Sequence, residues 1–182
     1  NASVKISKLT KRLKPLVWLV LVALVLMMLS VIAYLFSAQT SISGKRQMKN
    51  LGDSVVIRFD ESDIPHIKAN SPADALFALG YLHATERSWQ LEMNRRIASG
   101  RLSEILGSET VSIDRFMRTL GIKRVAEKQF DKYPVAAKRL LQAYADGVNA
   151  GFYQLGWALP LEFFLTGSKP GVWTPVDSIS WS

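Results

Sequence analysis

The sequence contains no cysteine and only two histidines among its 182 residues. Disulfide bridges and zinc sites built on cysteine clusters are therefore excluded. The lack of cysteine does not distinguish an oxidising compartment from the cytosol, because a stable core needs no disulfide in either. RNA-binding signatures and stripes of alternating basic and aromatic residues are missing as well, so nucleic acid is not an expected partner.

Acidic residues are scarce relative to basic ones, 15 against 23, which gives a formal net charge of +8. The imbalance is concentrated at the start of the chain, where the first 14 residues include Lys5, Lys8, Lys11, Arg12 and Lys14. The remainder is close to balanced. Positive charge clustered at the N-terminus is typical of a segment that flanks a membrane anchor, and it does not indicate a nucleic-acid-binding surface.

Residues 16–36 form a long apolar run without any charged side chain. At a rise of about 1.5 Å per residue such a helix spans the roughly 30 Å hydrocarbon layer of a bilayer. Trp18 and Tyr34 lie near its two ends, where amphipathic rings favour the interface. Cations precede the run and none follows before Lys45. We therefore predict a cytoplasmic segment over 1–15, a single transmembrane signal anchor over 16–36 in the inner membrane, and export of the rest to the periplasm.

A cleaved signal peptide is the alternative interpretation of the same run. Its apolar region would be about 7–15 residues long and would end at a small-x-small site. Phe36-Ser37-Ala38 fits such a site poorly, whereas Ala38-Gln39-Thr40 is tolerable. Both interpretations export the remainder of the chain.

The exported part is predicted to begin with a tether over 37–52, followed by a truncated α+β (α/β) domain over 53–182. Alternating and β-branched residues predict strands at 54–59 and 64–69. Ser71 and Pro72 predict the start of a long helix that ends at Gly100, and Pro134 opens a second long amphipathic helix. Shorter helices are expected at 102–106 and at 113–120, and loops over 159–181. A continuation of the second helix past Gly121 to Phe130 is the alternative to its end at Leu120. Two strands alone do not form a stable sheet, so the domain is expected to be incomplete.

Glu86 interrupts the apolar stripe of the long helix between Leu82 and Trp89. An unpaired buried carboxylate is costly, so we expect it to be paired, protonated or bound to something. One hypothesis is a buried network with His83 and Gln90, which lie on the same helix face. The other is a ligand-binding or catalytic acid.

The remaining candidates indicate structure more than chemistry. No residue near His66 in the sequence is identifiable as a nucleophile for a catalytic triad. His83-x-x-Glu86 lacks the second histidine of a zinc-protease helix. No G-x-S-x-G motif, which would mark a nucleophilic serine, occurs. Ser43-Gly44-Lys45 lacks the first glycine of a phosphate-binding loop. Three cations at the end of the long helix, Arg95, Arg96 and Arg101, are expected to make surface pairs with Glu92 or Glu104.

Seven stretches resemble, in order, the start of the penicillin acylase family of N-terminal nucleophile hydrolases. They are IPHIKA (64–69), ALGYLHA (78–84), ERSWQLEMNRR (86–96), GRLSEILG (100–107), DRFMR (114–118), YADGVNA (144–150) and WTPVDS (173–178). Two positions depart from the usual pattern. Glu86 stands where the family often has aspartate, and Asp63 precedes Ile64 where it often has glycine.

The resemblance implies an exported precursor that cuts itself into an α and a β chain and folds as a four-layer αββα sandwich, often with a structural calcium. The new N-terminal serine of the β chain would attack a linear amide, with its own α-amine as base. This sequence matches only the early α chain, and no Ser-Asn pair typical of a β-chain start is present. We therefore assign no catalytic, cofactor-binding or metal residue here, and we expect these 182 residues alone to be inactive.

The resemblance thus predicts a hydrolase that removes the acyl group from a small N-acyl substrate, such as a β-lactam antibiotic or an acyl-homoserine lactone, in partnership with its own β chain. A non-catalytic, membrane-tethered binding or scaffold protein on the same fold is the alternative. The two hypotheses differ in whether a serine is freed at a chain start after cleavage.

Overall fold

The computed structural model describes the backbone of residues 2–37 and 44–181, and the side chains of residues 15, 17–33 and 44–181. The chain divides into two compact units, Asn1–Gln39 and Thr40–Ser182. Each unit is described by itself.

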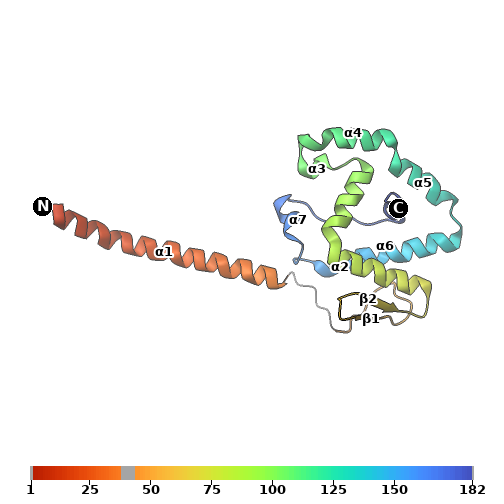
Figure 1. Ribbon diagram of the computed structural model, residues 1–182, viewed down its shortest axis with the longest axis horizontal. Helices are drawn as coiled ribbons and strands as arrows, with labels where there is room; N and C mark the ends of the chain where they lie inside the picture. Colours follow the sequence, from red (N-terminus) through yellow and green to blue (C-terminus); the bar gives the residue numbers. More distant parts are fainter. Residues whose placement is uncertain (1, 38–43, 182) are drawn as a thin grey trace. The chain divides into compact units, whose positions relative to one another are not determined.

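The first unit is a single helix, α1 (Ala2–Ser37), which includes Pro15 (Figure 1). It covers the predicted span 16–36 and also most of the segment 1–15. Among the side chains that the structure describes, no helix combines the length and apolarity that a bilayer crossing requires. The side chains at 16 and 34–36 lie outside the described residues. The predicted transmembrane helix is therefore not confirmed.

The second unit opens with an irregular segment and a β-hairpin. Residues 44–55 have no helix or strand, and β1 (Val56–Phe59) pairs antiparallel with β2 (Pro65–Lys68) so that Ile57 lies opposite Ile67. Both strands are slightly shorter than predicted. Pro65 stands at the first position of β2, as expected for a residue that donates no ladder hydrogen bond. Ile57 and Phe59 are half-buried while Val56 and Arg58 are exposed, which is the alternation of a one-sided sheet.

The long helix α2 (Pro72–Ser99) begins and ends where the sequence predicts. The Ser71 side chain accepts a hydrogen bond from the Asp74 amide, Pro72 occupies the first helical position, and Gly100 closes the helix with a left-handed φ of 62°. The sequence did not predict that α2 is kinked at Arg87, whose φ and ψ of −134° and 35° are not helical. The two halves of α2 therefore point in different directions.

Short helices follow α2 and lead to a second long helix. They are α3 (Ser103–Leu106), the 3-10 turn η1 (Ser108–Thr110), α4 (Val111–Leu120) and α5 (Ile122–Lys132), which precede α6 (Val135–Leu155). The helix predicted over 113–120 corresponds to α4, whereas the continuation to Phe130 is a separate helix, because Gly121 between them has a positive φ of 68°.

The tail beyond residue 159 contains two short helices where only loops were expected, α7 (Leu161–Leu165) and α8 (Pro175–Ile179). α8 starts with a capping box, in which Thr174 and Asp177 satisfy each other's amides, and with Pro175 at the first helical position. The prediction of loops was wrong here. Both the capping box and Pro175 are visible in the sequence and indicate the start of a helix.

The core forms where α2 crosses α6 (Figure 1). Its centre contains the buried side chains of Ala84, Ala145, Val148 and Trp173. The two helices approach closely because glycine stands at the crossing. A β-carbon on Gly147 would collide with the backbone carbonyl of Phe77 on α2. The crossing thus fixes the position of α2, against which the hairpin lies.

Candidate functional site

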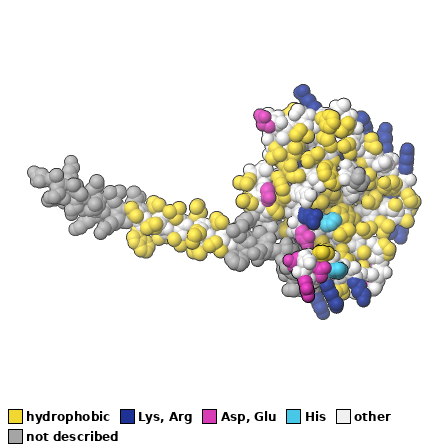
Figure 2. Space-filling view, in the orientation of Figure 1, with side chains coloured by type: hydrophobic (Ala, Val, Ile, Leu, Met, Phe, Trp, Pro, Cys, Tyr) yellow, Lys and Arg dark blue, Asp and Glu magenta, His cyan; other side chains and the backbone are white. Residues whose placement is uncertain are grey.

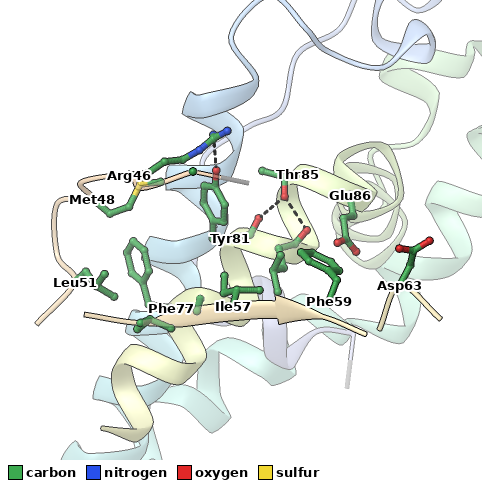
Figure 3. Close-up of a pocket in the computed structure, with 14 residues that line it drawn as sticks. Arg46, Met48, Leu51, Ile57, Phe59, Asp63, Phe77, Tyr81, Thr85 and Glu86 are labelled. Atoms are coloured by element: carbon green, nitrogen blue, oxygen red, sulfur yellow. Dashed lines mark hydrogen bonds between the residues drawn. The ribbon is translucent and has the colours of Figure 1, made fainter. Parts of the chain in front are cut away.

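A cavity of about 530 Å³ lies between the irregular segment 44–51, strand β1 and the first half of α2 (Figure 3). Its walls are mainly apolar and aromatic, and include Met48, Leu51, Ile57, Phe59, Phe77 and Tyr81. The strand contributes through its half-buried alternate residues, and the helix through one face of its first turns. This is the concave, largely apolar shape typical of small-molecule sites.

Hydrogen bonds hold the irregular segment against the helices and so close one side of the cavity. Arg46 donates from Nη1 to the Tyr81 hydroxyl at 2.9 Å, and the Gly52 amide donates to Asp74 Oδ1 at 2.7 Å. Asn50 donates to Asp146 on α6 at 3.3 Å. Residues 44–52 of the predicted tether are therefore irregular but packed against the rest of the second unit, and residues 38–43 lie outside the described residues.

Glu86 is exposed and lines this cavity, which corrects the hypothesis of a buried network. No hydrogen bond joins it to His83 or Gln90 within the described part of the chain. The stripe that placed Glu86 in the core assumed one straight helix from Leu82 to Trp89, whereas α2 is kinked at Arg87. Figure 3 shows the Glu86 carboxylate at the same end of the cavity as that of Asp63.

His83 links α2 to α6 instead. Its Nδ1 lies 2.9 Å from the Tyr144 hydroxyl, and the two rings meet edge to face at 5.8 Å between centroids. Burial lowers the pKa of His83, and the nearby Arg87 lowers it further, although Glu86 acts in the opposite direction. The imidazole is therefore mainly neutral near pH 7 and acts as a packing and hydrogen-bonding group.

His66 is exposed and pairs with the carboxylate of Asp60 at 2.9 Å. The same carboxylate accepts the Ser62 and Ile64 amides and so closes the hairpin turn. These hydrogen bonds, that of His66 first, lower the pKa of Asp60. The imidazole partners that the structure identifies are therefore the Asp60 carboxylate for His66 and the Tyr144 hydroxyl for His83.

Glu92 is the most deeply buried carboxylate of α2 and has no exposed side-chain surface. It receives hydrogen bonds from Arg95 Nη2 at 2.7 Å, from Arg96 Nε at 2.6 Å and from the Gly171 amide at 3.1 Å. The sequence predicted these arginine partners correctly but placed them on the surface. The two arginine pairs lie within α2, and the Gly171 hydrogen bond joins the second half of α2 to the segment before α8.

Glu104 extends this network toward solvent. It pairs with Arg96 at 2.8 Å and with Arg101 at 2.8 Å. The hydrogen bond from Arg101 is the main reason that the pKa of Glu104 is lowered to about 2. The i, i+3 and i, i+4 spacings of Glu92, Arg95 and Arg96 were readable in the sequence, but their burial depends on the chain segment around Gly171.

Asp114 is a buried acid that no pattern in the sequence indicated. It accepts the backbone amides of Leu102 at 2.7 Å and Ser103 at 2.9 Å, and so caps the first turn of α3. Among the side chains described here, no group of three or more His, Asp or Glu residues is arranged to hold a metal ion.

Comparisons with known proteins place this arrangement in a family. Residues 54–182 match the family model described as penicillin amidase. The chain is 41% identical over 144 residues to penicillin acylase 2 proenzyme of Pseudomonas sp. (strain SE83), which covers 79% of this chain and 18% of that protein. It is 40% identical over 136 residues to the acyl-homoserine lactone acylase QuiP of Pseudomonas aeruginosa, covering 75% of this chain and 16% of that protein.

Among solved structures, the thermostable penicillin G acylase of Alcaligenes faecalis matches with a TM-score of 0.65 and 26% identity, over 70% of this chain and 69% of that one. The mostly helical second unit with its small sheet is thus similar in fold to a penicillin acylase. The chain spans less than a fifth of the length of the curated relatives named above. On the match of residues 54–182 and these identities, the chain belongs to the penicillin amidase family.

Proposed function

We propose that this chain is the early part of an amidohydrolase that cleaves the linear amide of a small N-acyl compound. The observation behind the proposal is the 40–41% identity to two relatives whose names describe a penicillin acylase and an acyl-homoserine lactone acylase. Penicillin side chains and acyl-homoserine lactones are both N-acyl amides, so the shared chemistry is hydrolysis of that bond. Because the chain spans only part of these relatives, the activity belongs to the full-length polypeptide.

In this proposal residues 44–181 are framework, and the attacking group comes from elsewhere in the polypeptide. A serine freed by self-cleavage would attack the amide carbonyl with its own α-amine as base, and preorganised donors would stabilise the oxyanion. One relative is described as a proenzyme, which supports maturation of this kind. Structural calcium in the full-length protein, as the family resemblance implies, would use ligands outside the described residues.

The proposed partner is the protein's own β chain. Large apolar side chains are exposed near the end of α6 and around α7, including Tyr153 at 90%, Trp157 at 93% and Leu165 at 77%. Figure 2 shows hydrophobic side chains over much of the visible face of the second unit. Contiguous apolar surface of this kind typically contacts another polypeptide. The β chain, fused or cleaved, is the partner that the relatives' maturation supports.

The activity is tested by expressing the full-length polypeptide and measuring acid release from penicillin G and from N-acyl-homoserine lactones. We expect hydrolysis of at least one of them and, by mass spectrometry, a new chain that begins with serine. The control replaces that serine by alanine, which should leave an uncut, inactive protein. A folded full-length protein without a freed serine and without acid release would instead favour the scaffold alternative.

We also propose that the second unit lies in the periplasm, with residues 1–15 in the cytoplasm. The support is the charge asymmetry around residues 16–36. In cell fractionation we expect an inner-membrane α chain that keeps residues 1–36, and whose residues 53–182 are digested by protease only after the outer membrane is opened. Leu24→Arg in the apolar run should release the protein from the membrane. Loss of about 4 kDa with a soluble periplasmic product would show a cleaved signal peptide instead.

A further inference from the structure

The charges around the cavity beside α2 are separated along its length. Three charged residues line it: Arg46, Asp63 and Glu86. Arg46 lies at one end, where it donates to the Tyr81 hydroxyl, while Asp63 and Glu86 lie at the other (Figure 3). Aromatic and aliphatic side chains occupy the space between the two ends. The cavity therefore offers a low-polarity interior with an excess of negative charge at one end.

Local backbone geometry sets the two carboxylates at that end. Asp63 has a positive φ of 58°, which aspartate adopts more readily than most residues, at the last position of the hairpin turn. Glu86 stands one residue before the kink of α2. Neither carboxylate receives a hydrogen bond or an ion pair from the described residues, whereas the buried acids Glu92 and Asp114 receive several. Unpaired carboxylates are common on protein surfaces. These two differ because they line a cavity that also contains aromatic side chains.

We propose that this cavity binds a small organic ammonium ion with an aromatic or branched aliphatic body. The ammonium group would lie between Asp63 and Glu86, near the ring of Phe59, where carboxylates and an aromatic face both favour a cation. The body would replace water against the walls formed by Ile57, Phe77 and Tyr81. Anions are disfavoured at the acidic end, and Arg46 is already bonded to Tyr81. This inference does not depend on the proposed hydrolase activity.

The probes are 2-phenylethylamine and two matched compounds, neutral 2-phenylethanol and anionic phenylacetate. Binding is measured by saturation-transfer NMR and calorimetry on the full-length polypeptide in a mild nonionic detergent at pH 7. We expect the amine to bind at least about tenfold more tightly than the alcohol, because a cation close to carboxylates and an aromatic face gains more than the neutral isostere. Phenylacetate should bind least. Affinity for the amine should fall with added salt.

Variants locate the site. Asp63→Asn with Glu86→Gln should weaken amine binding about tenfold or more without changing the circular dichroism spectrum, since both side chains are exposed. Glu109→Gln, which removes an exposed charge outside the cavity, should leave the affinity unchanged.

Several results would overturn the proposal. Equal affinity for amine and alcohol, unchanged binding in the double variant, or no saturable binding of the amine would each do so. A dimer in sedimentation whose formation excludes the amine would show that a second copy covers the cavity, and would also overturn it.

Discussion

Gly147→Ala is expected to disrupt the packing of α2 on α6 and to lower the free energy of unfolding by about 1–2 kcal/mol. A methyl group there would collide with the Phe77 carbonyl, and backbone cannot move aside as a flexible side chain can. Overpacking of this kind typically costs about 1–3 kcal/mol, occasionally more. Alanine has a higher helix propensity than glycine, which offsets only about 1 kcal/mol of the overpacking cost. The variant is therefore less stable overall. Urea unfolding in mild detergent, followed by tryptophan fluorescence, measures the change.

The same argument applies to Gly80 on the opposite helix, where a β-carbon would collide with the Tyr144 carbonyl. Gly80→Ala should therefore destabilise the chain to a similar extent. Ala136→Leu is the control, because it adds a larger side chain on an exposed position of α6 and should change stability by no more than about 0.5 kcal/mol. If both glycine variants unfolded like the parent chain, the close crossing of α2 and α6 would be wrong.

Much of the second unit could be predicted from local signals in the sequence. Ser71, Pro72 and Gly100 fixed the ends of α2, and the alternation in residues 54–59 indicated β1. These signals are local because caps and strand periodicity depend on a few neighbouring residues. The capping box at Thr174 is equally local, and α8 could have been predicted from it.

The candidate site could not be predicted in the same way, because it depends on how α2 bends. A kink at Arg87 has no proline or glycine to announce it. Periodicity extrapolated through it placed Glu86 in the core and left Glu92 at the surface, the reverse of the structure. The cavity also requires the segment 44–51, whose attachment depends on Tyr81 and Asp74 far along the chain. Such contacts have no periodic signature in the sequence.

Glu92→Gln is expected to have the second large effect, a loss of about 3–5 kcal/mol in the free energy of unfolding. The substitution keeps the size of the side chain but leaves the guanidinium groups of Arg95 and Arg96 without their buried counter-charge. Breaking one partner of a buried ion pair typically costs that much, because the remaining charge is neither solvated nor paired. Arg96 keeps Glu104 as a second partner, which places the expected loss nearer the lower end of that range. Urea unfolding in mild detergent is again the measurement.

Two further variants separate burial from simple loss of negative charge. Glu127→Gln removes the same charge from an exposed position on α5 and should change stability by less than about 0.5 kcal/mol. Arg95→Met in the Glu92→Gln background should add less destabilisation than it does alone, because residues in one network are not additive. The Gly171 amide also donates to Glu92, so the Glu92→Gln variant should loosen the segment before α8 and expose it to limited proteolysis. A Glu92→Gln chain as stable as Glu127→Gln would mean that Glu92 is solvated and that α2 does not hold the tail through it.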